Sequence, residues 1–141
     1  MTYLINEGSL TVTAADDRSI NVFTLVNELG APLQAIITRD KGETGEPLAE
    51  SVARQIKTLS RQVKNFKSIA KEELEITEAK WPAMLHQHSF SQGGQSAHQI
   101  QIVAQTPKQG FLIFTLSSTA PIAEEHRIAW IKTVTGFKPS I

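Results

Sequence analysis

Two histidines separated by one residue, His86 and His88, are the side chains in this sequence that come nearest to a chemical centre. Alternate residues of a β-strand share a face, so both imidazoles could converge on a metal ion such as zinc. The glycine pair at 93–94 predicts a tight hairpin turn just after them. A two-residue turn there places His88 opposite Gln99 and His86 opposite Gln101.

This register predicts two different faces for the hairpin. The histidines share a glutamine-rich face on which we expect no carboxylate, whereas the other face carries Leu85, Ile100 and Ile102. We therefore interpret the histidine pair as part of a solvated polar face, and we expect no metal ion and no cofactor. A metal-dependent enzyme built on His86 and His88 is the competing hypothesis.

The composition and motifs of the chain argue against several other kinds of site. The chain has no cysteine, which excludes disulfides, thiolate nucleophiles and zinc–thiolate sites. It also lacks a nucleophile elbow, a P-loop and a dinucleotide fingerprint, and the glycine-bearing loop at 42–46 is acidic. Fourteen basic and 14 acidic residues give zero net charge, which argues against a nucleic-acid partner. We expect no enzyme.

The elements that must position these side chains follow from hydrophobic periodicity and turn signals. We predict four strands, a helix, four strands and a second helix over 141 residues. The consecutive hairpins predict an α+β fold, a single domain of residues 1–141, with a curved antiparallel sheet and both helices packed on one face. The predicted strands are 3–5, 10–12, 19–26, 33–39, 68–77, 83–90, 97–105 and 111–117, and the helices run from Pro47 to Val63 and from about Pro121 to Gly136.

Each predicted helix has one apolar side. The first carries Leu48, Val52 and Ile56 at helical spacing, and its basic stripe is interpreted as a solvated back instead of a site for an acidic partner. On the second, Trp130 and Phe137 are predicted core residues. The basic stripe comprises Arg54, Lys57, Arg61 and Lys64.

The hairpin of the third and fourth strands has a more informative pattern. One face carries Phe23, Leu25, Leu33, Ala35 and Ile37. The opposite face mixes apolar and polar side chains: Ile20, Val22, Thr24, Gln34, Ile36 and Thr38. Two interpretations of this mixed face stay open, a partner-binding surface and ordinary core beneath a loop.

An ordered set of segments along nearly the whole chain resembles the DcrB-related family. The segments are 17–22 (Asp-Arg-Ser-Ile-Asn-Val), 36–40 (Ile-Ile-Thr-Arg-Asp), 45–46, 52–56 with Leu59, 114–118 and Trp130. We find no signal peptide, lipoprotein anchor or apolar run long enough to span a membrane, so we expect a cytoplasmic protein. Family members without a signal peptide are similar to the Eag-type adaptors of bacterial type VI secretion.

The resemblance implies a PsbP-like α/β/α fold and a cytoplasmic homodimer with a sheet-lined groove. Its expected partner is an effector protein, whose apolar N-terminal (transmembrane) helices it would hold while aiding loading on the secretion spike, without inserting into a membrane itself. A small-molecule or lipid carrier that uses the same groove is the alternative. The groove residues implied by the resemblance and by the mixed face are Ile20, Asn21, Val22, Thr24, Gln34, Ile36 and Thr38.

Overall fold

The computed structural model describes residues 2–5, 8–11, 20–25, 33–40, 45–107 and 110–139. The order of four strands, a helix, four strands and a helix confirms the prediction. The segment 17–19 of the family signature and residues 41–44 of the acidic loop lie outside the described residues. The elements are β1 (Thr2–Ile5), β2 (Gly8–Thr11), β3 (Asn21–Leu25), β4 (Leu33–Asp40), α1 (Leu48–Gln62), β5 (Lys64–Ile76), β6 (Trp81–Gln92), β7 (Gln95–Thr106), β8 (Gly110–Ser118) and α2 (Glu124–Thr135).

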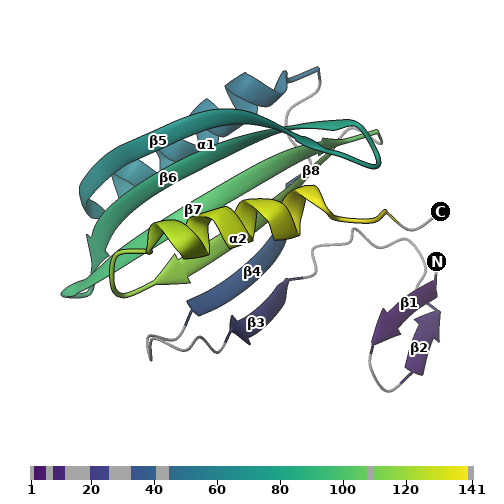
Figure 1. Cartoon of the computed structure of the whole chain (residues 1–141), viewed down its shortest axis with the longest axis horizontal. Coiled ribbons are helices and arrows are strands. Elements are labelled where there is room, and N and C mark those ends of the chain that lie inside the picture. The colour runs from purple at the N-terminus through teal and green to yellow at the C-terminus, as the bar shows by residue number, and fades with distance from the viewer. Residues whose placement is uncertain are drawn as a thin grey trace.

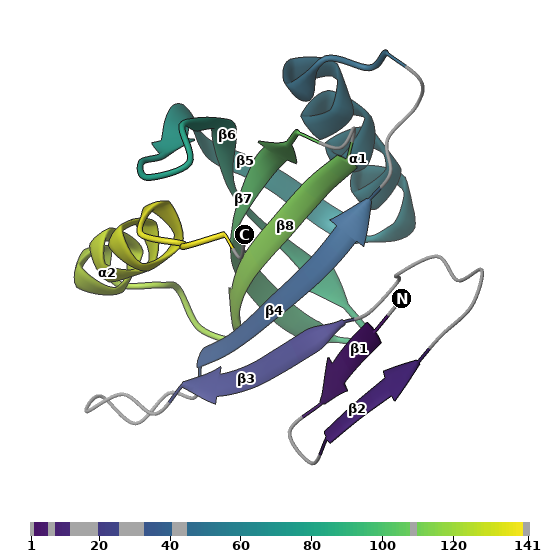
Figure 2. The ribbon, with the colours of Figure 1, turned by 90° about the vertical axis from the view of Figure 1, so that its right-hand side faces the viewer.

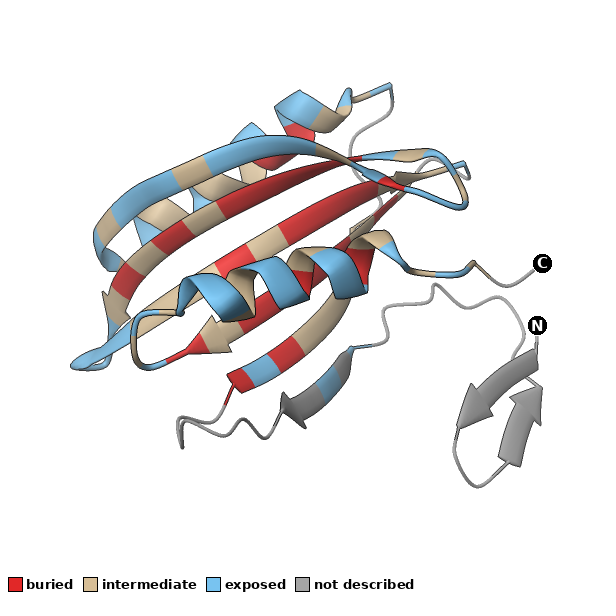
Figure 3. Cartoon of the chain, viewed as in Figure 1, coloured by how far each residue is buried: buried red, intermediate tan, exposed pale blue. Residues whose placement is uncertain are grey.

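Six strands form one antiparallel sheet in the order β3-β4-β8-β7-β6-β5, while β1 and β2 form a separate two-stranded sheet (Figure 1). β8 lies between β4 and β7, which confirms its prediction as a central strand. Its apolar side chains point to both faces, as expected for a strand that is covered on both sides. Figure 3 shows that buried residues are concentrated along β6, β7 and β8.

The turn between β6 and β7 has the predicted register. Gly93 and Gly94 have φ angles of 60° and 81°, a conformation that glycine adopts without steric cost. The primed turns of two-residue hairpins require such angles. The glycine pair therefore selects the turn, and the turn sets His88 opposite Gln99.

The two helices lie on opposite faces of the sheet, so the expectation that both pack on one face is wrong (Figure 2). On one face, α1 packs Val52 against Met84 and Val103. On the other, α2 packs Trp130 against a cluster that includes Ile102. Because β8 carries apolar side chains on both sides, each face of the sheet needs its own cover. The α+β class and the antiparallel sheet are confirmed, and the helix-sheet-helix layering is the one that the resemblance implied.

The helix boundaries follow the expected signals closely. On α1, Val52 is buried and Leu48 and Ile56 pack beside it, as the apolar stripe predicted. α2 starts at Glu124, a little after the predicted start near Pro121, and its backbone cap at the far end is Gly136. Acidic residues in the first turn and basic residues in the last turn of both helices complement the helix dipole.

β5 is an outer strand and starts at Lys64, whereas the prediction began at Ser68. The pairing of β5 with β6 has two register shifts, between Lys64 and Lys67 and between Ser68 and Ala70. Such bulges interrupt the alternation by which a strand is recognised in a sequence. The charged side chains along β5 also discourage pairing with a further strand.

Candidate partner-binding face

One face of the six-stranded sheet, the face that α1 covers in part, carries most of the predicted groove positions. Along this face, Val22 lies opposite Ile36 in the strand register, and Ile36 lies opposite Thr115 of β8. In the strand register, Asn21 pairs with Ile37, and Ile37 packs against the α2 cluster. The predicted positions that share the α1 face are Val22, Gln34, Ile36 and Thr38, and Thr24 pairs with Gln34 in the strand register.

Large apolar side chains are exposed at the β3 edge of the sheet, on β3 itself and on the residue just before it. Ile20 is 64% exposed and Val22 is 53% exposed, while Ile36 is half-buried. α1 packs chiefly on β5, β6 and β7, so it leaves this end of the sheet open. We call Ile20, Val22 and Ile36 the apolar strip. Apolar side chains gathered on an exposed strand are typical of a partner-binding surface.

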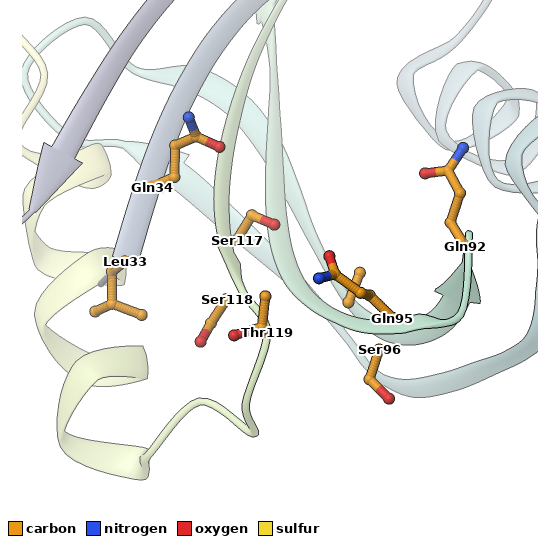
Figure 4. A pocket seen from close by; sticks show the side chains of 9 residues that line it. Leu33, Gln34, Gln92, Gln95, Ser96, Ser117, Ser118 and Thr119 are labelled. Carbon is orange, nitrogen blue, oxygen red and sulfur yellow. The ribbon is translucent and has the colours of Figure 1, made fainter. Parts of the chain in front are cut away.

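A pocket of about 360 Å³ opens where β4, β7 and β8 end (Figure 4). Leu33, Gln34 and Ser117 lie on one side of it, and Gln95 lies across from them. Among the described residues, its polar lining consists of amides and hydroxyls without a charged group, beside the apolar Leu33 and Ala97. The pocket therefore offers hydrogen bonds to an uncharged polar ligand or segment and has no acid–base pair for catalysis.

At the β6 end of the same face, the histidine pair is buried, so its interpretation as a solvated polar face is wrong. His86 is 3% exposed and His88 is 0% exposed. The ring of Phe66 stacks on His88 with centroids 5.4 Å apart, and Phe90 stacks on His88 at 6.0 Å. Phe66 reaches this face from the irregular stretch of β5, which no alternation pattern revealed.

A chain of hydrogen bonds satisfies the two buried imidazoles. The distances are 3.0 Å from Ser68 Oγ to His86 Nε2, 2.9 Å between the Nδ1 atoms of His86 and His88, and 2.9 Å from His88 Nε2 to Gln99 Oε1. An amide oxygen only accepts, so His88 donates from Nε2 and accepts at Nδ1 when neutral. His86 must then donate from Nδ1 and accept from the Ser68 hydroxyl at Nε2. All donors of the chain point toward Gln99.

Burial keeps both imidazoles neutral. Burial, the electrostatic interaction with His88 and the charge of Lys71 together lower the pKa of His86 to about 4. Burial also lowers the pKa of His88, against the opposing effect of its hydrogen bond to Gln99. An efficient general base has a pKa near the working pH, so His86 is a weak base for the Ser68 hydroxyl.

The described part of the chain contains no cluster of side chains that could bind a metal ion. Residues 20–139, apart from the gaps named above, contain no group of three or more His, Cys, Asp or Glu side chains placed to hold an ion. The two ring nitrogens of each histidine are also engaged within the hydrogen-bond chain. The pair is therefore arranged as a directional hydrogen-bond chain.

One residue of the basic stripe, Arg54, is hydrogen-bonded to two carboxylates, and the other residues of the stripe are exposed. Arg54 donates hydrogen bonds to Asp40 and Glu46, each at 2.9 Å, and these two carboxylates raise the pKa of its guanidinium. Arg54 thus ties α1 to the end of β4. Lys57 and Arg61 are exposed, as the solvated interpretation predicted. Neither α1 nor α2 has the length and apolar character of a membrane span.

The chain is similar to known proteins both in sequence and in fold. The DcrB family model matches residues 7–136. A Pseudomonas aeruginosa protein named Effector EagT6 is 28% identical over 131 residues, which cover 91% of this chain and 88% of that protein. The crystal structure of PA94, a P. aeruginosa protein of unknown function, is 26% identical and covers 100% of this chain and 97% of its own, with a TM-score of 0.83.

Proposed function

The chain belongs to the DcrB family, and from this premise we propose that it is a chaperone or adaptor of type VI secretion. In this proposal it binds the apolar N-terminal helices of an effector in the cytoplasm, as a homodimer, and helps to load the effector on the secretion spike. Its relation to Effector EagT6 supports a role beside an effector. The proposed activity needs binding and release but no catalysis.

The apolar strip is the observation that carries this proposal. Ile20 and Val22 leave more than half of their side-chain surface in water. Covering such side chains with an apolar helix is favourable by roughly 1–2 kcal/mol each, at about 25 cal/mol per Å². Gln34 and Thr38 stand beside the strip and offer hydrogen bonds to polar atoms of a membrane helix.

Charged substitutions in the strip test the proposal. Co-expression with an effector fragment that carries N-terminal apolar helices should yield a stable complex with the unmodified chain. Ile20→Asp or Val22→Asp should reduce the recovered complex more than about tenfold, because a carboxylate would be buried without a partner. Ile128→Asp is the matched control, since Ile128 is 58% exposed on α2, the helix that covers the other face.

Undiminished capture by a folded Ile20→Asp variant would contradict the proposal. A small-molecule or lipid carrier is the competing function. Stoichiometric lipid in the purified protein, found by mass spectrometry, would favour the carrier.

A further inference from the structure

Gln99 stands where the buried hydrogen-bond chain meets the open part of the sheet face. In the strand register, His88 lies opposite Gln99, Gln99 opposite Ser117, and Ser117 opposite Gln34. This row leads from the buried histidines to the β4 side of the face. Gln99 is half-buried, so it belongs partly to each environment.

The chain holds the Gln99 amide in one orientation. His88 donates to Gln99 Oε1, and the histidine is itself held by His86 and Ser68. The carbonyl end of the amide is therefore directed toward β6, which leaves the NH₂ end for the other side. Freezing a side chain in its binding orientation lowers the entropy that a ligand must overcome.

The NH₂ group of Gln99 reaches solvent. Among the described residues, Trp130 Nε1 is the side-chain nitrogen that is buried without a hydrogen-bond partner. Gln99 Nε2 makes no hydrogen bond within the described residues, but it is not one of the nitrogens that are buried without a partner. Part of this NH₂ group is therefore in contact with solvent and can donate to a ligand.

Gln101 provides a contrast on the same strand and the same face. It lies opposite His86, but both ring nitrogens of His86 are already engaged by Ser68 and His88. No hydrogen bond within the described residues fixes its amide. A histidine therefore holds the amide of Gln99 but not that of Gln101.

We propose that His88, supported by His86 and Ser68, is a positioning residue that presents the NH₂ group of Gln99 as a donor to a polar atom of the bound helix. This inference rests on the proposed function and adds a specificity determinant to it. An apolar helix that contains one hydrogen-bond acceptor would be bound more tightly than a wholly apolar helix. A net hydrogen bond of the usual strength gives a preference of about 3- to 10-fold.

The test uses two synthetic helices of about 20 residues of leucine and alanine, a membrane-spanning length. One has a central asparagine, and the other has leucine in its place. Their affinities for the full chain are measured in the same mild detergent. The readout is the ratio of the two affinities for the unmodified protein and for His88→Phe, Gln99→Met and Gln101→Met.

We expect the unmodified chain and Gln101→Met to prefer the asparagine helix, and His88→Phe and Gln99→Met to lose the preference. Phenylalanine retains the stack with Phe66 and Phe90 but cannot donate to the amide. A preference that survives in His88→Phe overturns the positioning role, as does its loss in Gln101→Met. Equal binding of both helices by the unmodified chain overturns this inference alone, whereas binding of neither helix contradicts the proposed function.

A second measurement does not depend on any variant. Imidazole nitrogen NMR of the unmodified protein at neutral pH should show His88 protonated at Nε2 and His86 protonated at Nδ1. The opposite pair of tautomers would reverse the hydrogen-bond chain and turn the Gln99 carbonyl toward the open face. That result would overturn the proposal even if His88→Phe failed to fold.

Discussion

The two ends of the sheet differ in which kind of side chain is exposed to water. At the β3 end, the apolar Ile20 and Val22 are 64% and 53% exposed, whereas at the β6 end the polar His86 and His88 are 3% and 0% exposed. The buried imidazoles are stable there because each ring nitrogen has a hydrogen-bond partner. Nothing comparable offsets the exposed apolar side chains within the described residues. The comparison teaches that the β6 end is complete by itself and that the β3 end is suited to a partner.

The largest expected effect on stability comes from a substitution in the buried histidine pair at the β6 end. His88→Ala should lower the free energy of unfolding by about 3 kcal/mol, because it leaves a cavity beneath Phe66 and removes the partners of His86 Nδ1 and Gln99 Oε1. Chemical denaturation measures the change. His98→Ala is the control, since His98 is only half-buried and should cost less than about 1 kcal/mol.

Acid should weaken the same end by a somewhat smaller amount. The pKa of His86 falls from an ordinary 6.5 to about 4 in the folded protein, so the unfolded chain binds more protons between these values. Stability is therefore fully present above pH 6.5 and is lost as the pH falls toward 4, by about 2.5 kcal/mol at pH 4.5. The charged and titratable groups that act on His86 are His88 and Lys71.

Denaturation curves at pH 7.5 and pH 4.5 measure this loss. The double variant His86→Phe/His88→Phe removes both titrating groups while retaining aromatic rings under Phe66. Its stability should change less over this interval than that of the unmodified protein. An equal change in both proteins would show that other groups cause the acid sensitivity.

The smallest expected effect on stability concerns the β3 end. Ile20→Ser and Val22→Ser should each change the free energy of unfolding by less than about 0.5 kcal/mol, because both side chains are already largely in water. Thermal or chemical unfolding of the isolated chain measures this. A loss above about 1.5 kcal/mol for either variant would mean that the strip is covered within the protein itself, which would remove the contrast between the two ends.

Local patterns predicted most of the secondary structure and the hairpin register. Gly93 and Gly94 selected their turn by backbone conformation alone, so the pairing of His88 with Gln99 followed from the sequence. The start of β5 did not, because bulges near Lys64 and Ser68 break the alternation. The wrong placement of both helices on one face overlooked Met84 and Val103, which form a second apolar surface opposite the first.

The candidate face was predictable only in part. Alternation placed Val22 and Ile36 on a shared face, because side-chain direction along a strand is a local property. The role of Gln99 had no signal beyond its register with His88, since the orientation of an amide depends on which groups surround it.

The sequence by itself determined the α+β class, the order of the elements and the side-chain pairs across each tight hairpin, because these depend on neighbours along the chain. The tertiary structure alone decided which positions meet water. Phe66, 20 or more residues away in the chain, buries the histidines that their own strand would leave polar and wet, while Ile20 and Val22 stay exposed because α1 packs elsewhere. Burial depends on what the rest of the chain places over a residue, and local patterns do not contain that information.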